Sequence, residues 1–199
     1  MSLSINDLIL SKNIYILARS ETWHGSDTDK SVISELLPDC YNIHYLVRQG
    51  QKGGGVAIIY NSDLHVKLVK SAKHFTHFEL LECTVNSKDH QFQLYVLYRP
   101  PPSRVNTFKI VVYFKEWSEF LDMVVVTQME VLITGDLNFH IDDSNDSDAR
   151  KFIQTISGYG LQQHVNGATH VSGHTRDVII TRENSSLLLG SPTIQDPHL

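Results

Sequence analysis

The sequence predicts a single α/β or α+β domain in which β-sheets are covered on the outside by helices. Three observations predict this fold class. Many short apolar runs, rich in β-branched and aromatic residues, are separated by turn residues, as strands are. Two longer segments repeat their apolar residues at the helical period. The 199 residues contain no repeat and no low-complexity linker, and this length suits one domain with a substantial core.

The first half of the chain is predicted to consist mainly of strands. Residues 3–10 place Leu3, Asp7 and Leu10 about one turn apart and predict a short helix. A second helix is expected over residues 31–37, ended by a proline. The predicted strands cover residues 13–18, residues 53–61 after a glycine turn, the alternating runs 65–70 and 78–85, and residues 91–102, which end in three prolines.

The second half alternates helices with strands. Apolar residues recur at three- and four-residue steps over residues 105–122 and predict an amphipathic helix. Asp148 is expected to cap a further helix that ends near Gly158. The predicted strands of this half cover residues 129–134 and 177–181.

Composition excludes some classes of protein. The formal net charge is −5, so the chain has no global basic field for nucleic acid, and a nuclease would need a local basic rim or a metal ion. Cys40 and Cys83 are too few for a disulfide framework, and we expect two buried free thiols in a reducing compartment. The N-terminal segment, interrupted by Asn6, Asp7 and Lys12, matches neither a signal peptide nor a membrane span.

Polar side chains stand at the ends of four predicted strands. They are Glu21 after the first strand, Tyr98 and Arg99 before the prolines, Asp136 and Asn138 after residues 129–134, and Asp177 at the start of the last strand. Mg²⁺ prefers one or two carboxylates, with water and phosphate in its other positions, and Glu21 suits that role. Asp136 can orient or deprotonate a water molecule, and Asn138 can hold the water or a phosphate oxygen without adding charge.

Each of these residues also has a purely structural interpretation. Asp-x-Asn after a strand is a frequent turn, which we favour by roughly two chances in three when Asp136 and Asn138 are taken alone. Glu21 also suits a helix start, Tyr98 a half-buried strand and Asp177 a turn cap. The acidic tract 142–148 lacks the glycine and the terminal glutamate of an EF-hand, so we interpret it as a solvated loop. The 11 histidines show no helical ligand spacing for zinc.

The combination of motifs is more specific than any one of them. In order, the chain contains ETW at 21–23, GGGVAII at 53–59, YRPP at 98–101, GDLN at 135–138 and GHTRD at 173–177. This order resembles the endonuclease/exonuclease/phosphatase superfamily, and most closely the apurinic-type endonuclease domain of non-LTR (LINE-type) retrotransposons. The resemblance implies a four-layered α/β sandwich, two packed mixed sheets flanked by helices, that hydrolyses phosphodiesters with Mg²⁺ or Mn²⁺.

The same resemblance implies a role for each site residue. Glu21 would be the metal ligand, and Tyr98 would contact the scissile phosphate or support its charge. Asp136 would position or activate the attacking water, and Asn138 would hold that aspartate or the phosphate. Asp177 matches the aspartate that holds a catalytic histidine in one tautomer. The glycines at 53–55 are expected to allow a tight turn, and the prolines after Tyr98 to end an edge strand.

The sequence departs from the family pattern at three places. The expected Ser-Asp-His motif is not matched, because a proline separates Asp196 from His198. An opening strand with an asparagine near the metal is not matched either, since Asn6 lies in helix-like sequence. Arg176 stands where the retroelement pattern usually has an apolar residue. We therefore expect a domain over residues 1–199 that lacks the first strand and the Ser-Asp-His segment, with activity lowered roughly 10²- to 10⁴-fold.

The resemblance leads to one functional prediction and two alternatives. The first is a metal-dependent DNA-nicking endonuclease domain of retrotransposon origin, acting in the nucleus, without a membrane partner, and joined to a reverse transcriptase in a longer parent protein. The alternatives are a catalytically inactive relic or binding module of the same fold, and a phosphatase of the same superfamily. Binding of metal and DNA without cleavage would distinguish the inactive module from the nuclease.

Overall fold

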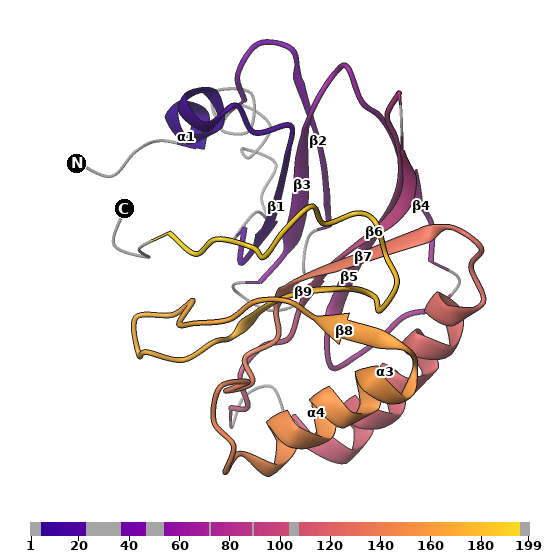
Figure 1. Ribbon diagram of the computed structural model, residues 1–199, viewed down its shortest axis with the longest axis vertical. Coiled ribbons are helices and arrows are strands. Elements are labelled where there is room, and N and C mark those ends of the chain that lie inside the picture. Colours follow the sequence, from indigo (N-terminus) through magenta and orange to yellow (C-terminus); the bar gives the residue numbers. More distant parts are fainter. Residues whose placement is uncertain are drawn as a thin grey trace.

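A computed structural model of the chain describes residues 5–22, 37–46, 54–71, 73–88, 90–103 and 108–195. Its strands form two sheets, with helices on the outside as the sequence predicts (Figure 1). Sheet A is antiparallel over its described strands, with β3 between β1 and β2. These strands are β1 (Ile16–Ser20), β2 (Tyr41–Leu46) and β3 (Val56–Asn61).

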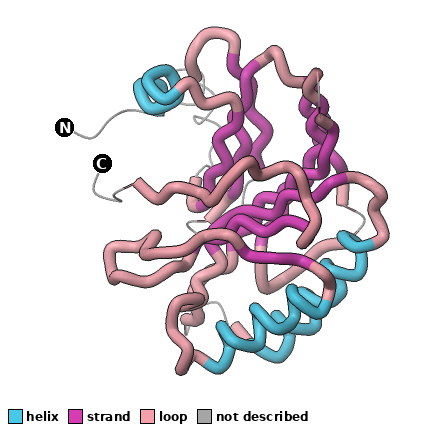
Figure 2. The backbone as a smooth tube through the Cα atoms, viewed as in Figure 1, coloured by secondary structure: helices cyan, strands magenta, loops and turns pink. Residues whose placement is uncertain are grey.

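Sheet B is mixed, and its strand order is β4-β5-β6-β7-β9-β8. The strands are β4 (His65–Val69), β5 (Glu79–Asn86), β6 (Gln91–Tyr98), β7 (Glu130–Asp136), β8 (Leu161–Gln163) and β9 (Asp177–Arg182). Among the described strands only β6 and β7 pair in parallel, and the chain between them includes helix α3 (Ile110–Val125). Such a crossover is what a parallel pair requires, because a tight turn can join only antiparallel strands. Figure 2 shows this alternation of strand and helix along the chain.

The helices make the outer layers of an α/β sandwich. Helix α3 and helix α4 (Ser147–Gly158) lie together on the outer side of sheet B, and α1 (Ile5–Lys12) lies beside sheet A at the other end of the molecule (Figure 1). The predicted fold class is therefore confirmed. No helix among the described residues is long and apolar enough to cross a membrane.

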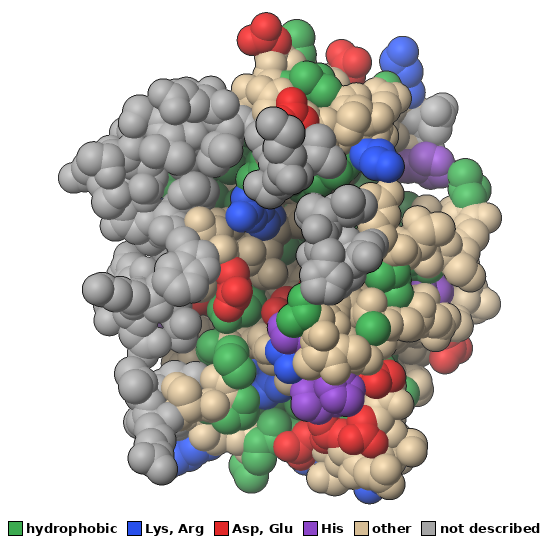
Figure 3. All heavy atoms as spheres, turned by 90° about the vertical axis from the view of Figure 1, so that its left-hand side faces the viewer, with side chains coloured by type: hydrophobic (Ala, Val, Ile, Leu, Met, Phe, Trp, Pro, Cys, Tyr) green, Lys and Arg blue, Asp and Glu red, His purple; other side chains and the backbone are tan. Residues whose placement is uncertain are grey.

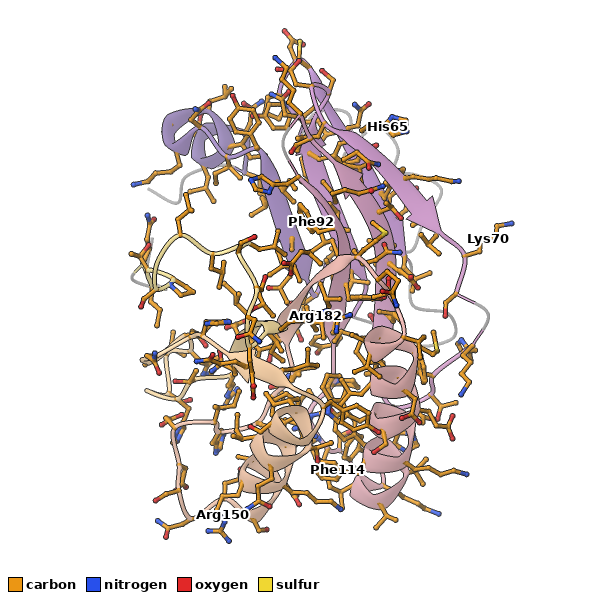
Figure 4. The ribbon with its side chains drawn as sticks, turned by 45° about the vertical axis from the view of Figure 1, so that its right-hand side comes forward. His65, Lys70, Phe92, Phe114, Arg150 and Arg182 are labelled. Atoms are coloured by element: carbon orange, nitrogen blue, oxygen red, sulfur yellow. The ribbon has the colours of Figure 1, made fainter. Side chains whose placement is uncertain are left out.

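Two hydrophobic clusters fill the space between these layers. The outer cluster packs one face of α3, including the fully buried Trp117, against α4 and sheet B; Figure 4 shows this crowded interior beside Phe114. The inner cluster lies between the sheets and joins Ile58 of β3 to Val96 and Tyr98 of β6. Each large buried apolar side chain contributes about 1.5–3 kcal/mol, so both clusters hold the strand ends in fixed positions.

Several predicted boundaries differ from the structure for local reasons. The first strand begins at Ile16 instead of Asn13, because Asn13 takes a φ of 51° and the N–H of Ile14 donates to the carbonyl of Ile9 at 3.0 Å, which closes α1. The cap of α4 is Asp146 and not Asp148, since Asp146 Oδ1 accepts from the N–H of Asp148 at 2.9 Å.

Three other expectations are corrected or left aside. Cys83 is buried as expected, and burial raises the pKa of its thiol to about 12, but Cys40 is exposed because it lies in the turn before β2. The prolines after Tyr98 end an inner strand, not an edge strand, because β6 pairs with β5 on one side and with β7 on the other. Their missing N–H groups are harmless there, since the ladder stops at Tyr98. The helix expected over 31–37 lies almost entirely outside the described residues.

Candidate active site

Three of the predicted site residues lie in one row across neighbouring strands of sheet B. Tyr98 is opposite Asp136 in the parallel pair β6–β7, and Asp136 is opposite Asp177 in the antiparallel pair β7–β9. Directly opposed residues point to the same face of a sheet, with Cβ atoms about 4.5–5.5 Å apart. Tyr98 belongs to the cluster between the sheets, so the row lies at the edge of that inner space.

Glu21 reaches the same place from sheet A. It follows β1 directly, and the hydroxyl of the almost fully buried Tyr98 donates a hydrogen bond to its Oε1. Burial, this hydrogen bond and nearby carboxylates all raise the pKa of Tyr98, so its hydroxyl stays protonated and acts as a donor. In this structure Tyr98 therefore positions Glu21, where the resemblance implied a contact with phosphate.

Asn138 and Asp136 make the turn that the cautious interpretation favoured, and they are also part of the row. The N–H of Asn138 donates to Asp136 Oδ1 at 2.8 Å, and Asn138 adopts a φ of 52°. No other described residue donates a hydrogen bond to the Asp136 carboxylate, so its second oxygen, Oδ2, stays available. The turn thus orients a carboxylate at the strand end.

Glycines allow the strands to approach closely at this edge. Gly135 has a φ of 140°, and a Cβ added there would lie 2.8 Å from the carbonyl carbon of Leu97, 2.9 Å from its nitrogen and closer still to its oxygen. Gly55 has a φ of 90°, and a Cβ there would overlap the hydroxyl of Thr22. The GGG motif therefore lets β3 begin against the residue that follows Glu21.

Arg99 locks the loop that carries Asn138, a role that no local sequence pattern indicates. Its Nε donates to the carbonyl of Leu137 and its Nη2 to the carbonyl of Asn138 at 2.6 Å. In return, Asn138 Nδ2 donates to the carbonyl of Arg99 at 2.9 Å. Arg99 is 3% exposed and its Cζ lies 3.9 Å from the ring centroid of Phe139, so aromatic contact and two carbonyls stabilise the buried charge.

Glu79 is a second residue that sequence reasoning missed. It is opposite Tyr98 in the pair β5–β6 and so extends the row by one strand. Its Oε2 accepts the N–H of Gly55 at 2.6 Å and ties the start of β3 to sheet B. The available signal was weak, because β5 carries two glutamates, Glu79 and Glu82, and only the strand register shows that Glu79 lies in the row.

Burial and neighbouring carboxylates raise the pKa of Asp136. Burial, and next the charges of Asp177 and Glu21, raise the pKa of Asp136 to about 6, although the N–H of Asn138 and the charge of Arg176 lower it. Burial also raises the pKa of Asp177. Asp136 and Asp177 therefore face each other at reduced solvation, with Glu21 nearby, and a divalent cation would relieve the repulsion on Asp136.

The donor set fits a magnesium-type ion better than a caged metal. The described part of the chain holds no group of three or more His, Cys, Asp or Glu side chains that could ligate one ion. Mg²⁺ and Mn²⁺ take one or two protein carboxylates and complete their shell with water and phosphate oxygens. Glu21 can supply the carboxylate of such a partial shell, with the free oxygen of Asp136 close enough in the row to act on a bound water.

Comparisons with known proteins support the fold. No protein-family model and no curated protein matches the sequence. Among solved structures, an AP endonuclease from Leishmania major has a TM-score of 0.61 at 11% identity, covering 90% of this chain and 73% of that chain. A mannosyl-6-phosphatase from Bacteroides thetaiotaomicron has a TM-score of 0.64 at 14% identity, covering 90% and 75%. A 3′ phosphatase from Neisseria, bound to a product DNA hairpin, has a TM-score of 0.60 at 13% identity, covering 88% and 79%.

These structures have the endonuclease/exonuclease/phosphatase fold, and the chain shares it. Their identities to this chain are low, so the shared property is the arrangement of sheets and helices.

Proposed function

We propose that this chain is a divalent-metal-dependent phosphodiesterase that nicks DNA, of the kind found in non-LTR retrotransposons. One observation carries the proposal: Glu21 of one sheet is held by Tyr98 beside the carboxylate row of the other. Two packed sheets thus meet at an edge that presents acidic groups and a neutral hydroxyl donor. The order of motifs from ETW to GHTRD supports the retrotransposon origin, and the Leishmania AP endonuclease and the DNA-bound Neisseria phosphatase support a DNA substrate.

Each residue has a task in this reaction. Mg²⁺ or Mn²⁺, when bound at Glu21, supplies Lewis-acid stabilisation of charge on the phosphoryl group. Tyr98 holds the Glu21 carboxylate in place. Asp136, with a pKa of about 6, is mainly ionised at neutral pH, so its Oδ2 can orient a water molecule and accept its proton.

Asn138 and Asp177 support that carboxylate. The N–H of Asn138 fixes Asp136 Oδ1, while the reciprocal hydrogen bonds with Arg99 hold Asn138 itself. Asp177 lies opposite Asp136, and its charge raises the basicity of the neighbour. A nuclear location and a reverse transcriptase joined to the same parent protein belong to this proposal, since both follow from the retrotransposon origin.

Nicking of supercoiled plasmid tests the proposal. We expect open circles with Mg²⁺ or Mn²⁺ and none with EDTA. Glu21→Ala should slow nicking at least about 100-fold, because the bound cation supplies several kcal/mol of charge stabilisation. Glu119→Ala is the matched control and should nick like the wild type, since Glu119 lies on α3 in an ion pair with Lys73 at 3.2 Å.

The same preparation separates the two alternatives. The similarity to a mannosyl-6-phosphatase favours a phosphatase as the second candidate. If the chain releases phosphate from a monoester in a metal-dependent reaction but does not nick DNA, its function is that of a phosphatase and not of a nuclease. A folded, monodisperse chain that binds metal and DNA but cleaves neither substrate would be the inactive binding module.

A further inference from the structure

The turn that leads into β9 is a rigid element beside the carboxylate row. The N–H groups of Thr169 and His170 donate to the carbonyl of His174 at 3.0 and 3.1 Å, and the N–H of Gly173 donates to the carbonyl of His170 at 2.9 Å. The hydroxyl of Thr169 accepts the N–H groups of Arg176 at 2.9 Å and Asp177 at 3.0 Å. This turn therefore presents its side chains in fixed positions next to Asp177.

Two nitrogen-bearing side chains of this turn converge on one hydroxyl. The oxygen Oγ of Ser172 lies 2.8 Å from Nδ1 of His170 and accepts Nη2 of Arg176 at 3.3 Å. The N–H of Ser172 donates to the same Nδ1 at 3.1 Å, so the neutral ring carries its proton on Nε2. Within the described part of the chain Nε2 makes no hydrogen bond, and His170 is left with a donor to offer.

Arg176 has unused donors as well. Its Nε is buried without a hydrogen-bond partner, and no described carboxylate lies within 4.0 Å of its guanidinium. Its charge nevertheless lowers the pKa of both Asp136 and Asp177, so it lies close to the row. The planar guanidinium of a half-buried arginine binds oxyanions such as carboxylate and phosphate through paired N–H groups, and in a nuclease the oxyanion at hand is the phosphate of the nucleic-acid backbone.

The position of these donors decides which phosphate they meet. Tyr98, Asp136 and Asp177 succeed one another across the sheet, and Arg176 directly precedes Asp177, at the end of the row away from Glu21. If the phosphate that is hydrolysed lies at Glu21 and Asp136, the end of the row beside His170 and Arg176 is open to the neighbouring phosphate of the same DNA strand. Figure 3 shows histidine and basic side chains beside acidic ones on this face of the molecule.

We propose that Arg176 and His170, joined through Ser172, form a phosphate-binding subsite for the nucleic-acid backbone phosphate next to the one that is hydrolysed. The inference rests on the proposed function and deepens it. It also gives a role to the arginine that departs from the retroelement pattern. In a chain of net charge −5, a local cation of this kind offsets repulsion between the acidic site and DNA.

Binding of a fluorescein-labelled DNA duplex to the whole chain, in EDTA and over a series of salt concentrations, tests this subsite. We expect Arg176→Leu to bind about tenfold more weakly, with a salt slope reduced by about 1. Arg176→Lys should fall between, because it keeps the charge and loses the paired donors. Arg150→Leu removes the same charge from an exposed residue of α4, whose side chain points away from the sheets in Figure 4, and should bind within about twofold of the wild type.

Every outcome bears on the subsite. Equal affinities and slopes for Arg176→Leu and Arg150→Leu would overturn it, while parallel nicking by the wild type would leave the proposed function standing. A wild type that neither binds nor nicks duplex would remove both. Inorganic phosphate, added as a competitor at equal ionic strength, tests whether the subsite takes free phosphate as well as the DNA backbone. If it weakens DNA binding by the wild type but not by Arg176→Leu, the subsite also binds free phosphate. If phosphate competes equally in both proteins, free phosphate binds at another position. The subsite is then judged by the duplex affinities of Arg176→Leu and Arg150→Leu.

Discussion

Gly135→Ala is expected to prevent the chain from folding cooperatively. Gly135 lies in β7 with a φ of 140°, and the backbone of Leu97 in β6 occupies the space that a side chain at this position would need. A Cβ there could be accommodated only if the two central strands of sheet B moved apart, and backbone does not give way as a flexible side chain does. A cost of at least about 4 kcal/mol is expected, which is a large fraction of the about 5–15 kcal/mol by which an ordinary domain is stable.

Urea unfolding followed by circular dichroism measures this effect. Gly158→Ala is the control, because nothing lies within 4 Å of a Cβ at that position and it ends α4. We expect the control to be as stable as the wild type, or more stable by up to about 1 kcal/mol. A Gly135→Ala variant with the wild-type midpoint would show that β6 and β7 do not approach as closely as described here.

Asp136→Asn is expected to abolish activity and to stabilise the fold. Nicking should fall by roughly 10²- to 10⁴-fold, because an amide cannot accept the proton of the attacking water. The amide keeps an oxygen for the N–H of Asn138, so the turn is retained. It removes a carboxylate whose ionisation is opposed by burial and by the charges of Asp177 and Glu21.

The stability gain has a defined pH dependence. The pKa of Asp136 in the folded chain is about 6, above its ordinary value of 3.8, so the folded state holds this proton more tightly than the unfolded state. The stabilising contribution of this group is therefore complete below about pH 3.8 and is lost as the pH rises through about 6. Without metal, Asp136→Asn should thus exceed the wild type by on the order of 2 kcal/mol at pH 8, and the difference should shrink towards pH 4.

Urea midpoints at the two pH values, in EDTA, measure this difference. A variant less stable than the wild type at pH 8 would mean that Asp136 makes a favourable contact in the fold, contrary to the crowding described here. Added Mg²⁺ should narrow the gap at pH 8, because an ion that binds the folded wild type stabilises it by mass action.

The sequence predicted the strands best where apolar runs are continuous and bounded. β3, β5, β7 and β9 follow such runs, and their interiors lie between two layers. β2 and β8 escaped prediction. β2 alternates Asn42 and His44 with apolar residues over only six residues at an edge of sheet A, and β8 is a three-residue edge strand, so each signal is short.

The site was predictable in its residue types and not in its geometry. Strand ends that carry Glu21, Asp136 and Asp177 can be seen in the sequence, since each polar residue borders an apolar run. That Asp136 lies opposite both Tyr98 and Asp177 depends on pairing between strands far apart in the chain, which local patterns do not encode.

Backbone conformation was equally hidden. Glu21 and Asn138 both adopt positive φ, of 53° and 52°, a region that non-glycine residues seldom occupy and that concentrates at functional sites. Arg99 stood out only as the residue before the prolines. Its clamp on the loop after β7 appears once β6 and β7 are placed side by side.

Titration calorimetry with Mn²⁺ tests most directly the claim that two sheets assemble one metal site at their shared edge. We predict one bound ion in the wild type and at least about tenfold weaker binding by Glu21→Gln. Glu119→Gln is the matched control, because it removes one distant carboxylate and should leave the Mn²⁺ affinity unchanged. Equal Mn²⁺ affinities for the wild type and Glu21→Gln would contradict the account, because Glu21 could then not be the ligand that Tyr98 positions.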